Sequence, residues 1–188
     1  MADLRIPILI GSVRRNRQSP KVARWISRIL ESDKRIESEL LDLEELALPI
    51  MEERVRMRDD VPPGAARLSE GLAAADAVVI VTPEYNNGYP GVLKNALDYM
   101  LPELKRKPVG VVTVSAGGFG GVNCLAQLRQ VLLAMGAVPI PASLPVSRVG
   151  QTFDDDGPVD DALSDRATRF VDELLWWTEA TVRQRTSV

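Results

Sequence analysis

Short apolar runs alternate with amphipathic segments along this 188-residue chain, and that alternation restricts the possible folds more than any other feature. The apolar runs predict strands at Leu4–Ile10, Ile36–Leu41, Ala77–Thr82, Val109–Val114 and Ala137–Ile140. Strands that are apolar throughout are typical of a parallel sheet with helices packed on both faces. The sequence therefore predicts an α/β fold with one doubly wound, five-stranded parallel sheet, in a single domain that covers residues 1–188.

The amphipathic segments predict helices at Pro20–Leu30, Gly121–Met135 and about Asp161–Gln184. Ser19 followed by Pro20 is a favourable start for the first of them, with Ser19 as the cap. Pro7 removes a backbone donor from a strand inside the sheet, so we expect a β-bulge there. The stretch Leu43–Ala66 contains acidic residues and prolines and indicates a long excursion over the surface.

Histidine is absent from the chain and cysteine occurs once, at Cys124, and both facts narrow the chemistry. Without histidine there is no Ser-His-Asp or Cys-His nucleophile system and no imidazole base or metal ligand. Cys124 lies on an apolar helical segment and is expected to be a small core residue. The acidic run that ends at Gly157 lacks the ligand spacing of an EF-hand, so we expect no metal site. Demanding chemistry is therefore expected to come from a bound cofactor.

The net charge of -3 gives the protein no general attraction to nucleic acid or to anionic membranes. No apolar run is long enough to cross a bilayer, and the start of the chain reads as a strand rather than a signal peptide. We therefore expect a cytoplasmic protein that acts on small molecules. Trp25, Trp176 and Trp177 are expected to pack in the core or at a subunit contact.

Three unusual loops follow the first, third and fourth predicted strands, and they comprise Gly11–Ser19, Thr82–Gly91 and Ser115–Gly121. In a doubly wound sheet with strand order 2-1-3-4-5, ligands bind beyond the carboxyl ends of the first and third strands. The first loop leads into a helix, whose unpaired N–H groups suit a phosphate. The second forms a rigid turn that can present backbone and aromatic groups to a flat heterocycle. The third is mostly glycine, so its backbone can approach a ligand closely.

Each loop also has a plainer interpretation when it is taken alone. The first could be an ordinary turn, with a solvated basic stripe formed by Arg17, Lys21, Arg24 and Arg28. The second could be a turn with no ligand, and the third a flexible connection to the next helix. The hypothesis of one shared site therefore depends on the three loops meeting at one edge of the sheet.

Two blocks of residues resemble the NAD(P)H-dependent FMN reductases, a family with a flavodoxin-like fold that includes quinone, azo-dye and chromate reductases. The first block is Gly11-Ser12-Val13-Arg14. The second begins with Pro83-Glu84-Tyr85-Asn86 and continues with Gly91-Val92-Leu93-Lys94-Asn95-Ala96-Leu97-Asp98. Their order and spacing match the family over the whole chain. The resemblance implies a flavodoxin-like sheet of order 2-1-3-4-5.

The resemblance also implies which residues hold the cofactor. The residues implied to hold the FMN phosphate are Ser12, Arg14, Gln18 and Ser19. Those implied to contact the isoalloxazine ring are Pro83, Glu84, Tyr85 and Asn86. Those implied to lie at the opposite edge of the ring are Ser115, Ala116 and Gly117. The first loop is longer and more basic than is usual in the family, so which of Arg14, Arg15 and Arg17 meets the phosphate stays open. No side chain is implied as a catalytic acid or base.

The activity that the resemblance implies is transfer of hydride from NADPH or NADH, through bound FMN, to a small acceptor. Quinones, azo compounds, free flavins and metal oxyanions are the acceptor classes, and the family implies a homodimer or homotetramer. Two alternatives remain open. One is a flavodoxin-type electron carrier, although the phosphate loops of such carriers are typically rich in threonine and glycine rather than arginine. The other is a glycosyl-transfer enzyme that uses Glu84 as its nucleophile.

Overall fold

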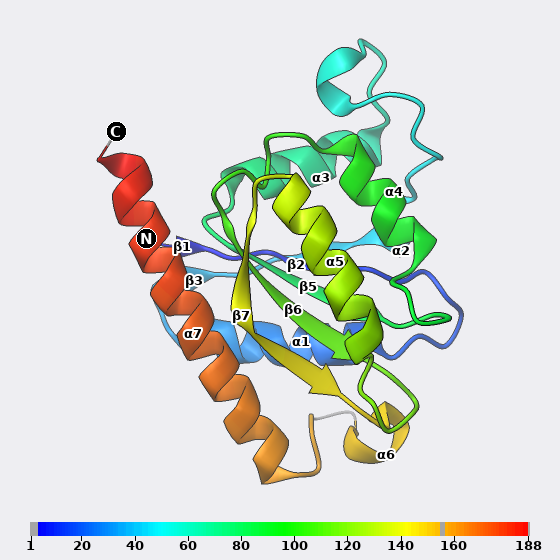
Figure 1. Ribbon diagram of the computed structural model, residues 1–188, viewed down its shortest axis with the longest axis vertical. Coiled ribbons are helices and arrows are strands. Elements are labelled where there is room, and N and C mark those ends of the chain that lie inside the picture. The colour runs from blue at the N-terminus through cyan, green and yellow to red at the C-terminus, as the bar shows by residue number, and fades with distance from the viewer. Residues whose placement is uncertain (1–3, 155–156, 188) are drawn as a thin grey trace.

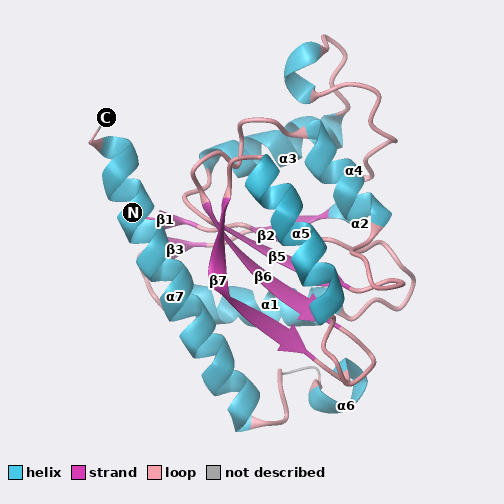
Figure 2. Cartoon of the chain, viewed as in Figure 1, coloured by secondary structure: helices cyan, strands magenta, loops and turns pink. Residues whose placement is uncertain are grey.

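The computed structural model describes residues 4–154 and 157–187, so Asp155 and Asp156 of the acidic run lie outside the described residues. Five parallel strands form the main sheet, in the order β4–β2–β5–β6–β7 (Figures 1 and 2). Their bounds are Leu40–Asp42 for β4, Ile8–Ile10 for β2, Val78–Pro83 for β5, Pro108–Val114 for β6 and Val138–Val146 for β7. This is the order 2-1-3-4-5 along the chain, so the flavodoxin-like prediction is confirmed.

Helices cover both faces of this sheet. Because successive residues of a strand point to opposite faces, the central strands β2, β5 and β6 contribute side chains to two cores. The helices run over Ser19–Glu31 (α1), Pro63–Ala74 (α3), Gly91–Tyr99 (α4), Val122–Ala134 (α5) and Asp161–Thr186 (α7). Ile8 and Ile10 of β2 belong to the core under α1 and α7, whereas Leu9 belongs to the core under α3, α4 and α5. None of the helices in the described ranges is both long and apolar enough to cross a membrane.

Pro7 divides the first predicted strand in two instead of producing the expected bulge. The part before it is β1 (Leu4–Arg5), which pairs with β3 (Ile36–Glu37), and the part after it is β2. The offset between partner residues is the same on both sides of the break, so no residue has been inserted. The Pro7 carbonyl still accepts a hydrogen bond from the Val79 N–H at 3.0 Å. The bulge prediction was wrong, because the strand loses one donor and keeps its register.

The segment from Leu43 to Ala66 is more ordered than a surface excursion. It contains α2 (Leu43–Leu46), a short 3₁₀ helix (Val55–Met57) and the first turn of α3. Asn95 of α4 holds the stretch after α2: its Oδ1 accepts from the Met51 N–H at 2.8 Å, and its Nδ2 donates to the Pro49 carbonyl at 2.8 Å. One asparagine on α4 therefore fixes the backbone of a segment far from it in sequence.

The last strand and the last helix are both longer than predicted. β7 continues to Val146, well past the predicted end at Ile140, and a register irregularity opposite Val109–Val111 accompanies this length. Its prolines are tolerated because β7 lies at the edge of the sheet. A short helix, α6 (Val149–Thr152), follows, and the chain ends in α7.

The three tryptophans do not share one environment. Trp25 is buried on α1 and Trp177 is partly buried against the same core, as expected. Trp176 is 62% exposed, so it does not pack in the core, and a subunit contact stays a prediction for this residue. The two neighbours on α7 face different surroundings because adjacent helix positions point about 100° apart.

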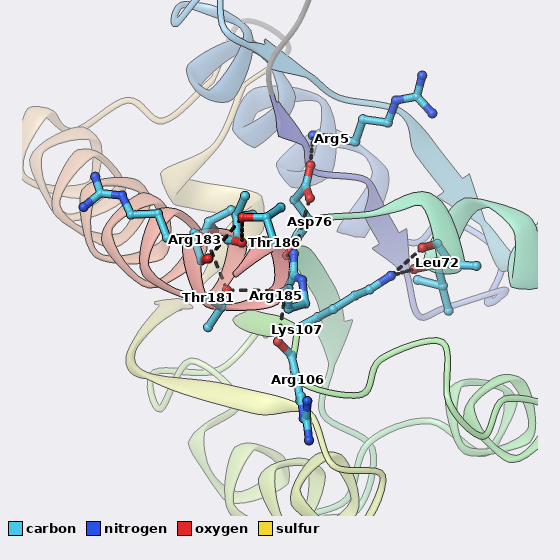
Figure 3. Close-up of polar contacts among 12 residues, drawn as sticks. Arg5, Leu72, Asp76, Arg106, Lys107, Thr181, Arg183, Arg185 and Thr186 are labelled. Carbon is cyan, nitrogen blue, oxygen red and sulfur yellow. Dashed lines mark hydrogen bonds and ion pairs between the residues drawn. The ribbon is translucent and has the colours of Figure 1, made fainter. Parts of the chain in front are cut away.

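Arg185, near the end of α7, fastens this helix to the amino ends of the strands (Figure 3). Its guanidinium donates to the carbonyl of Asp76 at 3.2 Å and to that of Arg106 at 3.0 Å, and it pairs with the Asp76 carboxylate at 3.3 Å. Asp76 also accepts from the Arg5 N–H at 3.0 Å. The first strand, the start of β5 and the last helix are therefore joined through one carboxylate, at the end of the sheet opposite the unusual loops.

Lys107 lies beside this cluster, and its ammonium group is buried (Figure 3). Its Nζ donates to the carbonyls of Leu72 at 2.7 Å and Ala73 at 2.6 Å, which belong to the last turn of α3. Burial lowers the pKa of Lys107 from 10.5 to about 8, and the positive charge of Arg185 acts in the same direction. The attraction of Asp76 and Glu103 opposes the shift but is smaller.

This shift predicts that stability rises with pH between about 8 and 10.5. In that window the unfolded lysine is still protonated while the folded one has lost its proton, so the unfolded state binds more protons. The Lys107 contribution to the slope is at most about 1.4 kcal/mol per pH unit. Urea unfolding of the wild type and of Lys107→Met at several pH values measures it. Parallel pH profiles for the two proteins would contradict the prediction.

Candidate active site

A cavity of about 580 Å³ opens at the carboxyl ends of the strands, the end toward which the arrowheads of β6 and β7 point in Figure 2. The loops after β2, β5 and β6 all contribute to it, so the three unusual loops do meet at one edge. Its lining comprises Ser12, Arg14, Arg15, Asn16, Arg17, Gln18, Ser19, Pro83, Glu84, Tyr85, Val114, Ser115, Ala116, Gly117, Phe119, Gly121 and Val149. Every residue predicted for the cofactor is among them except Asn86.

The first loop ends at the N-terminus of α1, which opens into the cavity. The N-cap is Gln18 rather than the expected Ser19, and Ser19 is the buried first residue of the helix. No side chain caps this helix end, and its first turn contains no acidic residue. Pro20 has no N–H and the Lys21 N–H donates to the Gln18 carbonyl at 3.1 Å, so this helix end offers an anion the Ser19 N–H and the positive end of the helix dipole.

The three arginines of this loop have different surroundings. The guanidinium of Arg17 pairs with the Asp42 carboxylate at 2.5 Å, contacts Glu44 and donates to the Ser12 carbonyl at 2.5 Å. The side chain is only 11% exposed, and its hydrogen bond with Asp42 is the main cause that raises its pKa. Arg17 is therefore not part of a solvated basic stripe, and its charge is already neutralised.

Arg14 and Arg15 are exposed, and both line the cavity. The Arg14 guanidinium lies 5.7 Å from the centre of the Tyr85 ring, a cation–π contact between the first and second loops. The Tyr85 hydroxyl shares a hydrogen bond of 2.9 Å with the Ser12 hydroxyl, which joins the same loops at a second point. Of the three arginines, Arg14 and Arg15 are therefore the ones that remain able to meet an anion.

The second loop is a tight turn from Tyr85 to Gly88. Two backbone hydrogen bonds of 2.8 and 3.0 Å join these residues, and Asn86 and Asn87 have φ values of 51° and 63°. Asparagine tolerates this left-handed conformation better than most residues, which explains the amide-rich sequence. Asn86 lines a separate hollow of about 460 Å³, together with Arg14, Glu84 and Tyr85. The structure therefore places it beside the main cavity and not within its lining.

The carboxylate of Glu84 is bound to the start of α5. It accepts from the backbone N–H groups of Asn123 at 2.9 Å and Cys124 at 3.1 Å, and from Nδ2 of Asn123 at 3.1 Å. A nucleophile in a glycosyl-transfer reaction needs a carboxylate oxygen directed at its substrate. Both oxygens are engaged with the protein, which argues against that alternative.

The third loop is anchored at both of its ends. The Gly117 carbonyl accepts from the Arg148 N–H at 3.0 Å, and the Thr113 hydroxyl donates to the Gly120 carbonyl. Gly120 has a φ of 66°, and a Cβ there would lie 2.7 Å from Pro145, so this position requires glycine. Phe119, which the sequence reasoning did not single out, lines the cavity and is 84% exposed. Its one signal in the sequence is that it interrupts a run of glycines.

Cys124 lies behind this loop and is fully buried, as predicted for a core residue. Burial raises the pKa of its thiol to about 12, and the charge of Glu84 adds to the shift. A thiol in this state is a poor nucleophile and a poor redox group. The cavity therefore has no thiolate chemistry of its own.

The cavity fits a phosphorylated flat heterocycle. The open end of α1 and the nearby hydroxyls of Ser12 and Ser19 suit a phosphate. The turn from Tyr85 to Gly88 and the loop from Ser115 to Gly121, called the glycine loop below, form walls that bring backbone close to a ring. The volume of the cavity falls within the range of small-molecule cofactor sites, roughly 300–1,000 Å³. The donor set is thus that of a mononucleotide site.

Comparisons with known proteins agree with this geometry. The family described as NADPH-dependent FMN reductase matches residues 4–151. An NAD(P)H-dependent FMN reductase of Saccharomyces cerevisiae is 32% identical over 168 residues, which cover 75% of this chain and 87% of that protein. A quinone reductase of Pseudomonas putida is 33% identical over 183 residues, which cover 93% of this chain and 94% of that protein.

Among solved structures, the flavoenzyme NAD(P)H:(acceptor) oxidoreductase of Paracoccus denitrificans has a TM-score of 0.78 and is 28% identical, with 95% of this chain and 98% of that chain covered. These matches favour the reductase over the electron carrier and the glycosyl-transfer enzyme. The chain belongs to the NADPH-dependent FMN reductase family and is an oxidoreductase that uses FMN and NAD(P)H.

Proposed function

We propose that this chain binds one FMN in the cavity and reduces flat, conjugated acceptors of the quinone type. The observation that carries the proposal is the open N-terminus of α1, which faces the same cavity as the turn and the glycine loop. The proposed phosphate ligands are Ser12, Arg14, Gln18 and Ser19; the proposed ring contacts are Pro83, Glu84, Tyr85 and Asn86, with Ser115, Ala116 and Gly117 at the opposite edge. Glu84 would contact the ring through its backbone, because its carboxylate is bound to the start of α5.

When FMN is bound, it supplies the chemistry by which two electrons pass from nicotinamide to the acceptor. The residues of this chain bind the FMN and orient it. The first turn of α1 and the hydroxyls of Ser12 and Ser19 offset the negative charge of the phosphate. Backbone groups of the Tyr85–Gly88 turn and the Ser115–Gly121 loop fix the plane of the ring and exclude water from one side. No cavity side chain is needed to move a proton.

The direct test is a titration of the apoprotein with FMN, followed by NADPH and a quinone. We expect saturable quenching of flavin fluorescence at a stoichiometry of one per chain, and steady NADPH oxidation only when the quinone is present. Riboflavin, which lacks the phosphate, is the matched control and should bind at least about 100-fold more weakly. Equal binding of FMN and riboflavin would contradict the phosphate site.

The choice of a flat acceptor rests on Phe119, because an exposed aromatic ring beside the cavity can stack on another ring. Phe119→Ala is expected to raise KM for a benzoquinone about fivefold, in line with an aromatic contact of about 1 kcal/mol, and to leave KM for ferricyanide unchanged. Leu133→Ala is the control, since Leu133 is 62% exposed on α5 and lies outside the cavity lining. Equal changes in KM for both acceptors would refute an aromatic contact.

We also propose that the protein works in the cytoplasm as a homodimer or homotetramer. Ile50 is 86% exposed in the segment that Asn95 holds against α4, and Leu101, just after α4, is 45% exposed. A protein contact that covers these two apolar side chains would remove them from water. A chain with a single, buried cysteine has no need of an oxidising compartment. Light scattering at micromolar concentration measures the mass, and a monomer would contradict the proposal.

A further inference from the structure

Two long helices, α1 and α5, begin at the cavity edge, and their N-termini have different surroundings. The start of α1 has no side-chain cap and no acidic residue. The start of α5 has a glycine at its N-cap, Gly121, which has no side chain to offer. Glu84, a residue of another loop, supplies the missing acceptor through three hydrogen bonds of 2.9 to 3.1 Å. The carboxylate therefore occupies the place that an external anion would otherwise take.

The same contacts join two walls of the cavity. Asn123, which binds Glu84, also donates from Nδ2 to Oδ1 of Asn87 at 3.3 Å, and Gln127 donates to the Asn87 carbonyl at 3.0 Å. The turn is thus held to α5 at its entry by Glu84 and at its tip by Asn87. Because α5 follows the glycine loop directly, any shift of the turn relative to α5 also changes the spacing between the turn and that loop.

From these two observations we infer that Glu84 is a positioning residue with an electrostatic role. Its carboxylate fixes the Tyr85–Gly88 turn against the glycine loop and closes the α5 helix end to anions. Among the described residues of the cavity, the start of α1 is then the helix end that remains open to a phosphate. This selects a ligand with one phosphate group, a mononucleotide, in a single orientation. The inference rests on the proposed FMN site.

The test compares Glu84→Ala and Glu84→Gln with Glu45→Gln, an exposed glutamate of α2 that lies outside the cavity. The first readout uses apoprotein and inorganic phosphate alone. We expect phosphate to raise the melting temperature of Glu84→Ala by several degrees more than that of the wild type, because the α5 helix end is now open. Glu45→Gln should respond as the wild type does. Identical responses in all proteins would overturn the electrostatic role.

The second readout is FMN binding and the visible circular dichroism of the bound flavin. Glu84→Ala is expected to raise the Kd for FMN at least about tenfold and to change the dichroism, because the turn is no longer held. Glu84→Gln keeps an acceptor oxygen for the two N–H groups, so it should restore Kd to within about threefold of the wild type. An alanine variant with wild-type Kd and dichroism would overturn the positioning role.

Failure of the proposed FMN site gives a different result. In that case wild-type apoprotein does not bind FMN with a preference over riboflavin. The effect of Glu84→Ala on phosphate-dependent melting still tests whether the carboxylate closes the α5 helix end. A lower melting temperature of the Glu84→Ala apoprotein in phosphate-free buffer tests the contact between the turn and α5, and an unchanged value overturns it.

Discussion

Replacing Gln18 with aspartate is expected to weaken FMN binding by at least about 100-fold and, at the same time, to make the apoprotein more stable. Gln18 is the N-cap of α1 and makes no side-chain cap bond. An aspartate at this position can accept from the Lys21 N–H, which otherwise donates to the Gln18 carbonyl in a tight first turn, and it interacts favourably with the helix dipole; together these are worth about 0.5–2 kcal/mol. The same carboxylate would repel a phosphate at this helix end by several kcal/mol. A substitution that stabilises the apoprotein and weakens FMN binding would show that the helix cap and the FMN phosphate occupy the same place.

Gln18→Asn separates the two effects. Asparagine caps a helix about as well as aspartate but carries no charge, so the gain in stability should persist and the Kd for FMN should change by less than about fivefold. Denaturant unfolding of the apoproteins and fluorescence titration with FMN provide the two measurements. An aspartate variant that binds FMN as the wild type does would show that the phosphate lies elsewhere.

Gly64→Ala is expected to destabilise the protein by about 3 kcal/mol or more, the largest effect on stability that we expect from a single methyl group. A Cβ at Gly64 would lie 1.8 Å from the carbonyl oxygen of Leu46, and this oxygen belongs to the backbone, where no rotamer change can relieve the overlap. Glycine at this position therefore permits α2 and α3 to pack closely. The change in unfolding free energy is measured in urea, with the m-value checked for two-state behaviour.

Gly91→Ala is the matched control, because Gly91 also lies in the first turn of a helix and next to a proline. No atom lies within 4 Å of a Cβ built there. The substitution should be neutral or should stabilise α4 by up to about 1 kcal/mol, as alanine does relative to glycine in a helix. Similar losses for Gly64→Ala and Gly91→Ala would show that helix propensity, not the contact with Leu46, decides the outcome.

The parts of the fold that could be predicted are those in which the sequence pattern is local. Ala77–Thr82 was placed within one residue of β5, because every residue from Ala77 to Thr82 is buried and is apolar or has a small side chain. α3 was missed, since it begins with Pro63 and Gly64, directly after an acidic loop. Its buried positions, such as Leu68 and Leu72, follow the helical period but are separated by small residues. Packing against the sheet, rather than propensity, stabilises this helix.

For the site, the position of the loops could be predicted and the partners of charged residues could not. Strand order alone brings Ser12, Tyr85 and Ser115 to one edge, because the carboxyl ends of parallel strands lie together. The neutralisation of Arg17 depends on Asp42, which lies on a neighbouring strand, and nothing in the first loop indicates that pairing. Ion pairs between distant parts of the chain follow from the geometry of the fold and leave no periodic signal.

The burial of Cys124 bears on the proposed reduction of quinones. Quinones are soft electrophiles, and their usual targets in proteins are accessible thiolates and, more slowly, imidazoles and amines. This chain has no histidine, and its one thiol is buried, which raises the pKa of that thiol to about 12. The described part of the chain therefore offers no accessible thiolate to a quinone in the proposed reaction.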